Sequence, residues 1–417
     1  MRKALYVVTA VTVIGLAGSC EFFMGSKDLS GMSEKNVTLW FGSGTEASQA
    51  SRSVLPGGMI NSLRYEVELR GPGGQVITRS VPAGSGMVTL TLTLGEWVIS
   101  ARAYTPEGIL AGMGTLAVTV ESAGTSVMIP MKAAAFPAGY RGTETANGAS
   151  FNLRYVPAGS FQRDGTPANI STITKGYWMG ETEVTQELWA AVMTGSDNLT
   201  SPSGFSSGPA SGEIQEKRPV ETITWYDAVE FCNRLSAATG KQAVYTLTGI
   251  TRSGGASGYI TAATVDADWS RNGYRLPTEM EWMWAAMGAT AGGPAVSATG
   301  YSKAFSGSTG SNILGDYEWY GVLYSLGGKT HETAKKLPNE LGIHDMTGNV
   351  QEFCWDWYAA YESGPQINHP GPASGTIRVG RGGIWDNNVS TCTIAYRDYG
   401  APNNRSFYGG FRVVSAP

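Results

Sequence analysis

The first half of the 417-residue chain contains short segments in which polar and apolar residues alternate. The clearest segments are 63–69, 88–94 and 97–104, and the glycine-rich run 71–74 separates the first two as a turn. Alternation with a period of two places one face of a strand against a core. Several such strands at short spacing are typical of an antiparallel sandwich. The pattern therefore predicts a small all-β, immunoglobulin-like sandwich over residues 37–132.

A different pattern continues from about residue 149 to the end of the chain. Apolar residues at helical spacing predict helices at 225–238 and 278–287. In the second segment, Thr278 is followed three residues later by Glu281, which is typical of a capping box at a helix start. Long loops rich in glycine, serine and threonine separate the two segments. The combination predicts an α+β domain over residues 149–417.

The first nineteen residues have the composition of an export signal. The basic residues Arg2 and Lys3 precede an apolar run at 4–16, and small residues follow that run. The run is too short to span a bilayer as a helix. We therefore expect residues 1–19 to be a signal peptide.

Cys20 follows the small residues directly and is similar to the lipid-acceptor cysteine of bacterial lipoproteins. That motif usually has leucine three residues before the cysteine, whereas Leu16 lies four residues before Cys20. A cysteine carrying several lipid chains anchors a protein stably, and the polar residues 20–36 are suited to a tether. The prediction is an exported lipoprotein on the outer surface of the cell envelope that contacts the membrane only through its lipid anchor. Ordinary secretion with an unmodified cysteine is the alternative.

Charge and cysteine content exclude several classes of function. The net charge is −4, and a protein that binds nucleic acid needs a basic face, so we expect no nucleic-acid partner. Three cysteines remain after processing (Cys232, Cys354 and Cys392), and an odd count leaves at least one of them free or intermolecular. The cysteines and the three histidines are scattered, so we predict no zinc site.

Several motifs occur in a fixed order through the C-terminal 270 residues. They include Val-Pro-Ala-Gly-Ser-Phe at 156–161, Arg-Leu-Pro-Thr-Glu at 275–279, Gly-Asn-Val-Gln-Glu at 348–352, Arg-Gly-Gly at 381–383 and Gly-Phe-Arg at 410–412. This series resembles the formylglycine-generating (sulfatase-modifying factor) family. The resemblance implies a C-type-lectin-like fold of the formylglycine-generating-enzyme type, and it covers the whole predicted α+β domain.

The family contains both enzymes and binding proteins, so the fold alone does not decide the function. The enzymes carry two cysteines after the Arg-Gly-Gly segment, which serve copper and substrate binding. The second of these matches Cys392, but the first is replaced by Asn387. Asparagine has no thiol to act as a nucleophile or as a soft metal ligand. We therefore predict that the protein is not an enzyme and has no catalytic residues.

Calcium is the one cofactor that the resemblance leaves open, because relatives often hold it through oxygen atoms of loops. Asp345, Asn349 and Asp356 are the candidate ligands for such a structural ion. We otherwise expect no cofactor and no metal site.

The charged residues of the motifs have mainly structural roles in this prediction. Arg275 is expected to form an ion pair and helix cap with Glu281 or with Glu279. Asn349 and Glu352 are expected to organise a loop.

The segment 381–412 separates into two interleaved groups of residues. We call the first the framework set, and it consists of Gly382, Gly383, Trp385, Val389, Cys392, Ile394, Ala395, Arg397, Pro402, Arg405, Gly410 and Phe411. We call the second the variable set, and it consists of Asp386, Asn387, Asn388, Ser390, Thr391, Tyr396, Asp398, Tyr399, Gly400, Ala401, Asn403, Asn404, Ser406, Phe407 and Tyr408. The variable set has the composition of an antibody paratope, in which aromatic residues supply contact area and small polar residues supply adaptable hydrogen bonds.

The residue types of the variable set share a property of their codons. Each type is reachable from the asparagine codon AAC by changing only its adenines. Lys, Glu, Gln, Met and Trp are not reachable in this way, and none of them occurs between Asp386 and Tyr408. This pattern resembles the variable region of a diversity-generating retroelement, in which the adenines of a template copy are randomised. The resemblance implies a surface-displayed receptor whose variable region, 381–412, binds different protein or glycan ligands of host or neighbouring cells.

Two other functions remain as alternatives, a formylglycine-generating-type oxidase and a carbohydrate-binding adhesin of fixed specificity. The receptor hypothesis makes a prediction about burial. Trp385, Arg397 and Phe411 should be buried. The aromatic residues of the variable set should be exposed and form one cluster, namely Tyr396, Tyr399, Phe407 and Tyr408.

Overall fold

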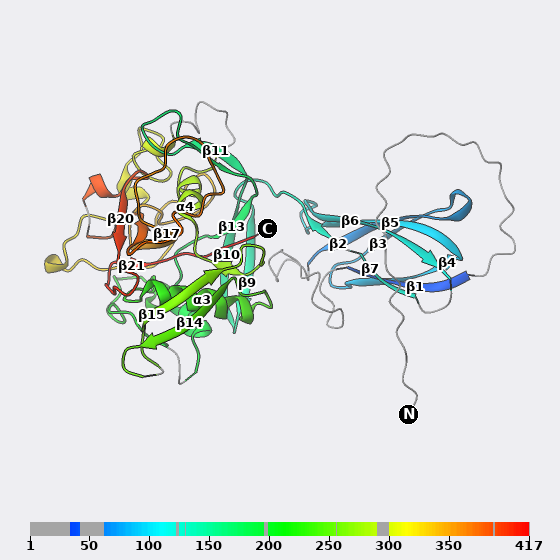
Figure 1. Cartoon of the computed structure of the whole chain (residues 1–417), viewed down its shortest axis with the longest axis horizontal. Coiled ribbons are helices and arrows are strands. Elements are labelled where there is room, and N and C mark those ends of the chain that lie inside the picture. The colour runs from blue at the N-terminus through cyan, green and yellow to red at the C-terminus, as the bar shows by residue number, and fades with distance from the viewer. Residues whose placement is uncertain are drawn as a thin grey trace.

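The computed structural model describes residues 34–41, 62–121, 125–129, 131–195, 199–255, 257–289, 300–386 and 388–416. The predicted signal peptide, Cys20 and the tether up to residue 33 lie outside the described residues. In the ranges just given, no helix is long and apolar enough to cross a membrane. The chain forms an N-terminal part made of strands and a C-terminal part that mixes strands, short helices and loops (Figure 1).

The N-terminal part is a sandwich of two sheets. The smaller sheet has the strand order β4 (Met87–Thr93), β1 (Glu34–Phe41) and β7 (Thr125–Ile129). The larger sheet has the order β3 (Val76–Val81), β2 (Arg64–Arg70), β5 (Gly95–Tyr104), β6 (Leu110–Val120) and β8 (Lys132–Ala133). A one-turn 3-10 helix, η1 (Pro72–Gly74), connects β2 to β3.

Alternation along the strands builds the core of this sandwich. Leu39 in β1, Val67 in β2 and Ile99 in β5 are buried, while their neighbours along each strand face outward. The three strands predicted from the sequence are β2, β4 and β5, each within two residues of the predicted start and one of the predicted end, so the all-β sandwich is confirmed. Strand β1 begins at Glu34, which shortens the predicted tether by three residues.

The C-terminal part contains several small sheets. The five-stranded sheet has the order β16 (Tyr274–Arg275), β22 (Val414–Ser415), β13 (Tyr177–Gly180), β10 (Ala149–Val156) and β9 (Arg141–Ala146). The four-stranded sheet has the order β20 (Arg397–Gly400), β19 (Arg378–Arg381), β17 (Gln351–Trp357) and β21 (Gly409–Gly410). A three-stranded sheet consists of β11 (Gly159–Gln162), β12 (Ile170–Ile173) and β18 (Gln366–Ile367), and a hairpin consists of β14 (Tyr245–Arg252) and β15 (Ile260–Ala267).

The domain begins earlier than the predicted residue 149. Strand β9 pairs with β10 in antiparallel register from Arg141 to Ala146. It therefore belongs to the same five-stranded sheet as β10, which begins at residue 149. Strand β22 near the C-terminus pairs with β13 in the same sheet, which brings the two ends of the domain together (Figure 1).

Within its described residues, the C-terminal domain has three α-helices: α2 (Gln186–Val192), α3 (Trp225–Ala238) and α4 (Glu279–Ala286). The two predicted helices are α3 and α4, whereas α2 is too short for its pattern to be read from the sequence. Both have capping boxes: the side chain of Thr224 accepts from the backbone of Asp227, and that of Thr278 accepts from the backbone of Glu281. Single turns of 3-10 helix complete the domain, namely η2 (Gln215–Lys217), η3 (Gly300–Ser302), η4 (Leu314–Asp316), η5 (Tyr324–Leu326) and η6 (Val389–Thr391).

All eight residues of α4 are buried, so this helix forms the centre of the domain core. Trp284 stacks on Phe161 of β11 at 5.5 Å. Trp282 donates its Nε1 hydrogen to Glu352 of β17 at 2.7 Å. The core therefore connects α4 to the sheet that carries the variable region.

Candidate functional site

The first half of the variable region is fixed by strand pairing and by an ion pair. Strand β20 pairs with β19 in antiparallel register, with Arg397 opposite Arg381. The guanidinium of Arg397 binds the carboxylate of Glu279 with two contacts, of 2.6 and 2.8 Å. Two parallel contacts of this kind fix orientation as well as distance. Arg381 donates from Nη1 to the carbonyl oxygen of Tyr396, which holds the backbone just before β20.

The second half of the variable region is docked through its backbone. The backbone nitrogen of Thr222 donates to the carbonyl oxygen of Ser406 at 3.0 Å, and that of Trp225 donates to Pro402 at 3.0 Å. Arg405 donates from Nε to the carbonyl oxygen of Thr222 at 2.8 Å. These three contacts use main-chain atoms or framework side chains, so they do not require any particular side chain in the variable set.

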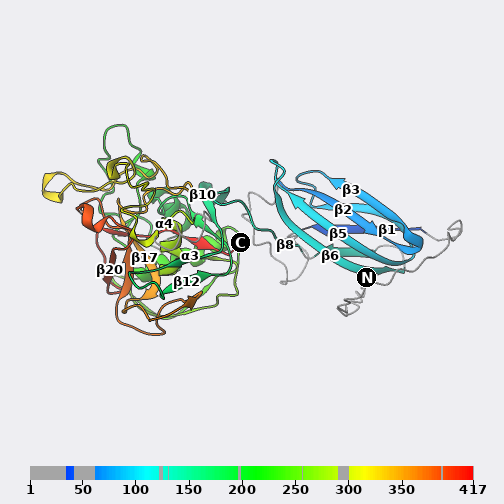
Figure 2. The ribbon, with the colours of Figure 1, turned by 90° about the horizontal axis from the view of Figure 1, so that it is seen from above.

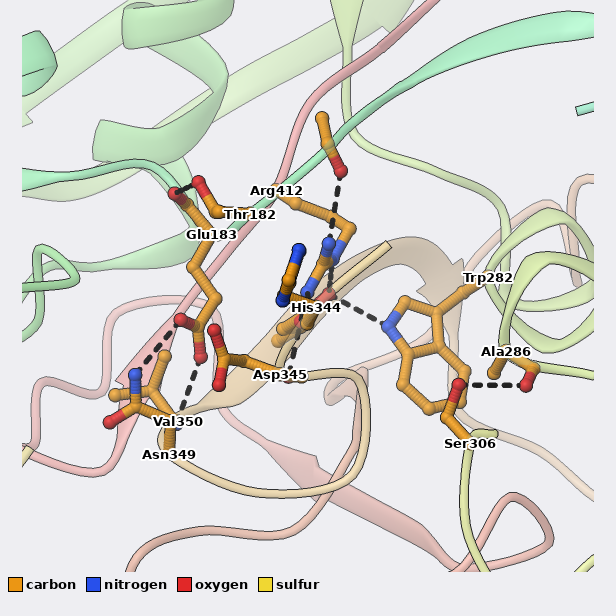
Figure 3. A network of polar contacts seen from close by, with 12 residues as sticks. Thr182, Glu183, Trp282, Ala286, Ser306, His344, Asp345, Asn349, Val350 and Arg412 are labelled. Atoms are coloured by element: carbon orange, nitrogen blue, oxygen red, sulfur yellow. Dashed lines mark hydrogen bonds and ion pairs between the residues drawn. The ribbon is translucent and has the colours of Figure 1, made fainter. Parts of the chain in front are cut away.

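A buried ion pair supports this region from inside the domain (Figure 3). Arg412 binds Glu352 through contacts of 2.7 and 2.6 Å, and both side chains are fully buried. Arg412 also donates to the carbonyl oxygens of Gly180 and His344, at 3.0 and 2.9 Å. Glu352 therefore anchors β17, next to the strands that carry the variable region.

More carboxyl groups are buried around Arg412. Glu183 accepts from the backbone of Val350 at 3.2 Å, and burial followed by the charges of Asp345 and Glu352 raises its pKa well above the usual range. Burial raises the pKa of Asp345 to about 6. The positive charge of the nearby Arg412 acts in the opposite direction and offsets part of the increase in the pKa of both acids. Burial therefore favours the neutral form of these two carboxyl groups in the folded protein.

The variable set lies at the surface. None of its fourteen described members is buried, and Asn387 lies outside the described residues. The exposed members are Asn388, Ser390, Tyr399, Ala401, Asn403 and Asn404. The half-buried members are Asp386, Thr391, Tyr396, Asp398, Gly400, Ser406, Phe407 and Tyr408. Some of the half-buried side chains make polar contacts at the surface: Tyr408 donates to Asp386 at 3.1 Å, and Gln351 donates to Asp398 at 2.6 Å.

The framework set is only partly buried. Trp385 and Phe411 are buried as predicted, whereas Arg397 is half-buried. Val389 and Ala395, although assigned to the framework set, are exposed. Val389 begins the 3-10 turn η6, which is capped by the side chain of Asn388 and leaves Val389 55% exposed.

Three of the four aromatic residues of the variable set form two groups rather than the one exposed cluster predicted, and only Tyr399 is exposed, whereas Tyr396, Phe407 and Tyr408 are half-buried. Phe407 contacts Tyr408 at 4.4 Å between ring centroids, and Trp385 lies beneath them at 6.2 and 5.6 Å. Tyr399 lies apart and contacts Tyr358 at 4.6 Å. Tyr399 lies in β20, at the edge of the four-stranded sheet, whereas Phe407 and Tyr408 lie in the loop that follows this strand.

Sequence reasoning missed two aromatic residues of the first group. Phe205 contacts Trp385 at 5.6 Å and Phe407 at 5.7 Å, and Tyr324 stacks on Phe407 at 5.2 Å. Tyr324 lies in a run of apolar residues with no charge, and this was the one available signal. Phe205 lies in a loop without any such signal.

The cysteine that matches the second enzyme cysteine is chemically protected. Cys392 is fully buried beside Phe305 and Leu314, and burial raises the pKa of its thiol to about 12. Because the thiolate is the reactive form, a buried thiol of this kind is a poor nucleophile and a poor metal ligand. Cys232 and Cys354 are also buried, and among the described residues neither forms a disulfide.

The three candidate calcium ligands do not form one group. Asp345 accepts from the backbone of Ala334 at 2.8 Å, and the side-chain oxygen of Asn349 accepts from the backbone of His331 at 2.9 Å. Asp356 instead accepts from the backbone of Glu279 at the start of α4, at 2.7 Å. Over the described part of the chain, no three His, Cys, Asp or Glu residues are arranged to hold a metal ion.

Comparison with known proteins identifies a family and several relatives of this chain. The family described as "Sulfatase-modifying factor enzyme 1-like domain" matches residues 143–417. The chain is 32% identical over 281 residues to "Chaperone protein LppX" of Paenibacillus barcinonensis, which covers 64% of this chain and 89% of that protein. It is 33% identical over 159 residues to the formylglycine-generating enzyme of Streptomyces coelicolor, which covers 37% of this chain and 49% of that enzyme.

A solved structure extends the likeness to the variable proteins. "Treponema denticola variable protein 1" is 36% identical, with a TM-score of 0.55, over 66% of this chain and 99% of that protein. The family match and this likeness confirm the resemblance to the formylglycine-generating family and the C-type-lectin-like fold. Proteins named as enzymes and proteins that are not so named occur among these relatives, so family membership leaves the activity open. The chain belongs to the sulfatase-modifying factor enzyme 1-like family.

Proposed function

We propose that the protein is a surface-displayed lipoprotein that binds ligands through the variable set and performs no catalysis. The observation that carries this proposal is that, within the segment 381–412, one group of residues holds the backbone and another group presents its side chains at the surface. The backbone of the segment is held by Arg381, Arg405 and main-chain hydrogen bonds, while every described side chain of the variable set reaches the surface. A backbone held in this way lowers the ordering cost of binding.

The same segment is suited to change without loss of the fold. Substitutions at surface positions typically alter the free energy of unfolding by less than about 0.5 kcal/mol. The codon pattern and the likeness to a variable protein of Treponema denticola support diversification by a retroelement. The ligands would be proteins or glycans of host or neighbouring cells, and they would differ from one variant to the next.

Export and anchoring are part of the proposal. The signal peptide and Cys20 would place the mature chain in the cell envelope, attached by lipid. Labelling of cells with palmitate should mark the wild-type chain and should not mark a Cys20→Ala variant.

A library test addresses the variable set directly. All fifteen positions of the set would be randomised in the full chain, and a control library would randomise Trp385, Cys392, Ile394 and Phe411. We expect most members of the first library to unfold cooperatively with midpoints within a few degrees of the wild type, because their contacts lie at the surface. Members of the control library should mostly fail to fold, because large core residues cost about 2–5 kcal/mol when truncated.

Equal failure rates in the two libraries would contradict the proposal. The first library should also yield binders when it is selected against two unrelated proteins, hen egg lysozyme and maltose-binding protein. A failure to yield any binder would equally count against a diversified binding surface.

The absence of catalysis has its own test. The purified protein, supplied with copper, would be incubated with a cysteine-containing sulfatase peptide, and formylglycine would be measured by mass spectrometry. We expect no conversion, since Cys392 is buried with a raised pKa and Asn387 replaces the other cysteine. A formylglycine-generating enzyme serves as the positive control, and measurable turnover would establish the oxidase alternative.

A further inference from the structure

A loop outside the variable set borders the proposed binding surface. We call residues 321–328, Gly-Val-Leu-Tyr-Ser-Leu-Gly-Gly, the apolar loop. It contains no charged residue. Four of its large side chains are exposed: Val322 at 47%, Leu323 at 53%, Tyr324 at 58% and Leu326 at 75%. The loop projects from the C-terminal domain and is drawn in yellow in two perpendicular views (Figures 1 and 2).

The backbone of the apolar loop is held in place by hydrogen bonds and by contact with Trp385, a member of the framework set. The backbone nitrogen of Val322 donates to the carbonyl oxygen of Trp385 at 3.2 Å, and that of Gly328 donates to Leu323 at 3.1 Å. Gly327 ends the turn η5 with a φ of 88°, which a residue with a side chain rarely adopts. Gly328 lies so close to the ring of Trp385 that an added Cβ would approach it to 2.5 Å. The loop and the variable region are therefore held by the same tryptophan.

The apolar loop also contacts the variable set directly. The ring of Tyr324 stacks on that of Phe407, with centroids 5.2 Å apart and an interplanar angle of 26°. Phe205 lies 6.3 Å from Tyr324 and 5.7 Å from Phe407, which continues the aromatic surface below both. The exposed side chains of the loop and those of residues 407–408 consequently belong to one continuous surface.

We propose that the apolar loop is a constant anchor of the binding surface, and that the ligands of this surface are proteins that carry a complementary apolar patch. The inference rests on the proposed function. Residues 321–328 lie outside the segment that varies, so every variant would present the same apolar contact. Exposed apolar patches next to a polar rim mark sites of protein association, and a few residues, often aromatic ones such as tyrosine, supply most of the affinity of such interfaces.

The charges around the loop favour a protein over a lipid surface. Segments that bind anionic membranes carry lysine or arginine beside their apolar residues. The apolar loop has none, and Lys329, which follows it, donates to the carbonyl oxygen of Gly208 at 2.9 Å. Glycans are also disfavoured at this part of the surface, because Tyr324 and Ser325 carry the only side-chain hydroxyl groups in the loop.

The experiment uses full-length binders selected from the variable-set library against lysozyme and against maltose-binding protein. In each binder, Leu323→Ser, Tyr324→Ser and Leu326→Ser would be introduced together. The matched control replaces two exposed apolar residues elsewhere, Ile250→Ser and Ile367→Ser, which are 44% and 67% exposed. We expect the loop variants to lose at least about tenfold in affinity for both targets, and the control variants to lose less than about twofold, because the control residues lie outside both the loop and the variable set.

Two further measurements keep the inference falsifiable if the triple variant is unstable. Leu326→Ser alone removes the most exposed side chain of the loop, and it should weaken binding about threefold with an unchanged melting temperature. Unchanged affinities in binders for both targets would overturn the constant anchor while leaving the variable surface intact. A failure to obtain binders would instead contradict the proposed function and this inference with it.

A vesicle experiment tests the lipid alternative. If the wild-type chain binds phosphatidylcholine–phosphatidylglycerol vesicles and the loop variant does not, the loop would be assigned to a lipid surface and the protein assignment would be overturned.

Discussion

Replacement of Arg412 by leucine is expected to lower the free energy of unfolding of the C-terminal domain by about 3–5 kcal/mol at pH 7. The guanidinium of Arg412 is fully buried and makes two contacts with Glu352 and three with backbone carbonyl oxygens. Without it, Glu352 keeps a buried charge with no cation, beside the acids Glu183 and Asp345. A typical domain has only about 5–15 kcal/mol of stability, so this loss is a large part of the total.

Urea unfolding followed by tryptophan fluorescence would measure the effect, because ten of the twelve tryptophans lie in the C-terminal domain. The control is Arg271→Leu, which removes an arginine from an exposed ion pair with Asp268 and should lower the stability far less, because solvent screens exposed pairs. The double variant Arg412→Leu/Glu352→Leu should recover part of the loss, because both charges are then absent. Losses of similar size for Arg412→Leu and Arg271→Leu would contradict the assigned role of the buried pair.

The second large effect is a decrease of stability as the pH rises from about 4 to 8. Asp345 has a pKa near 6 in the folded protein, raised by burial from an ordinary value of 3.8. Burial and the neighbouring charge of Glu279 raise the pKa of Asp356 to about 8. Between the unfolded and the folded pKa, the native state retains a proton that the unfolded state has released. The free energy of unfolding therefore falls as the pH rises through this window, and each contribution is lost above the folded pKa.

Substitution of Asp345 by asparagine should remove one part of this pH dependence. One carboxylate oxygen accepts from the backbone of Ala334 at 2.8 Å, and the other is buried without a hydrogen-bond partner. Asparagine keeps the accepting oxygen, carries no charge, and tolerates the left-handed backbone of this position, where φ is 57°. A shift of about two pKa units corresponds to about 3 kcal/mol, so the variant should be more stable than the wild type by up to about that amount at pH 8.

The measurement is a series of urea titrations between pH 4.5 and pH 8. The difference between Asp345→Asn and the wild type should shrink toward pH 4.5, where the native carboxyl is already protonated. Asp316→Asn is the matched control, because Asp316 is exposed and its substitution should have little effect at any pH. A stabilisation that is equal at both ends of the series would show that the charge of Asp345 is not its source.

Several features of the fold could be predicted from the sequence because they depend on neighbours along the chain. Period-two alternation identified β2, β4 and β5, and the capping residues placed the starts of α3 and α4. The ordered motifs identified the family, and the substitution of a cysteine by Asn387 was visible in the sequence itself.

The partners of charged side chains were not decided in this way. The sequence left Glu279 and Glu281 as alternative partners of Arg275. In the structure Glu281 pairs with Arg275 and Glu279 pairs with Arg397, because successive residues of α4 face different sides of the core. A contact between residues 118 positions apart depends on the path of the intervening chain, and no local pattern records that path.

The sequence by itself determined which residues of 381–412 have the composition of a binding surface, and that one required thiol of the oxidase chemistry is missing. Only the tertiary structure decided how that surface is built. It separated Tyr399 from Phe407 and Tyr408, exposed Val389 and brought Tyr324 onto Phe407. The physical reason is that composition and periodicity are properties of short segments, whereas ring contacts arise where segments distant in sequence are packed by a shared core.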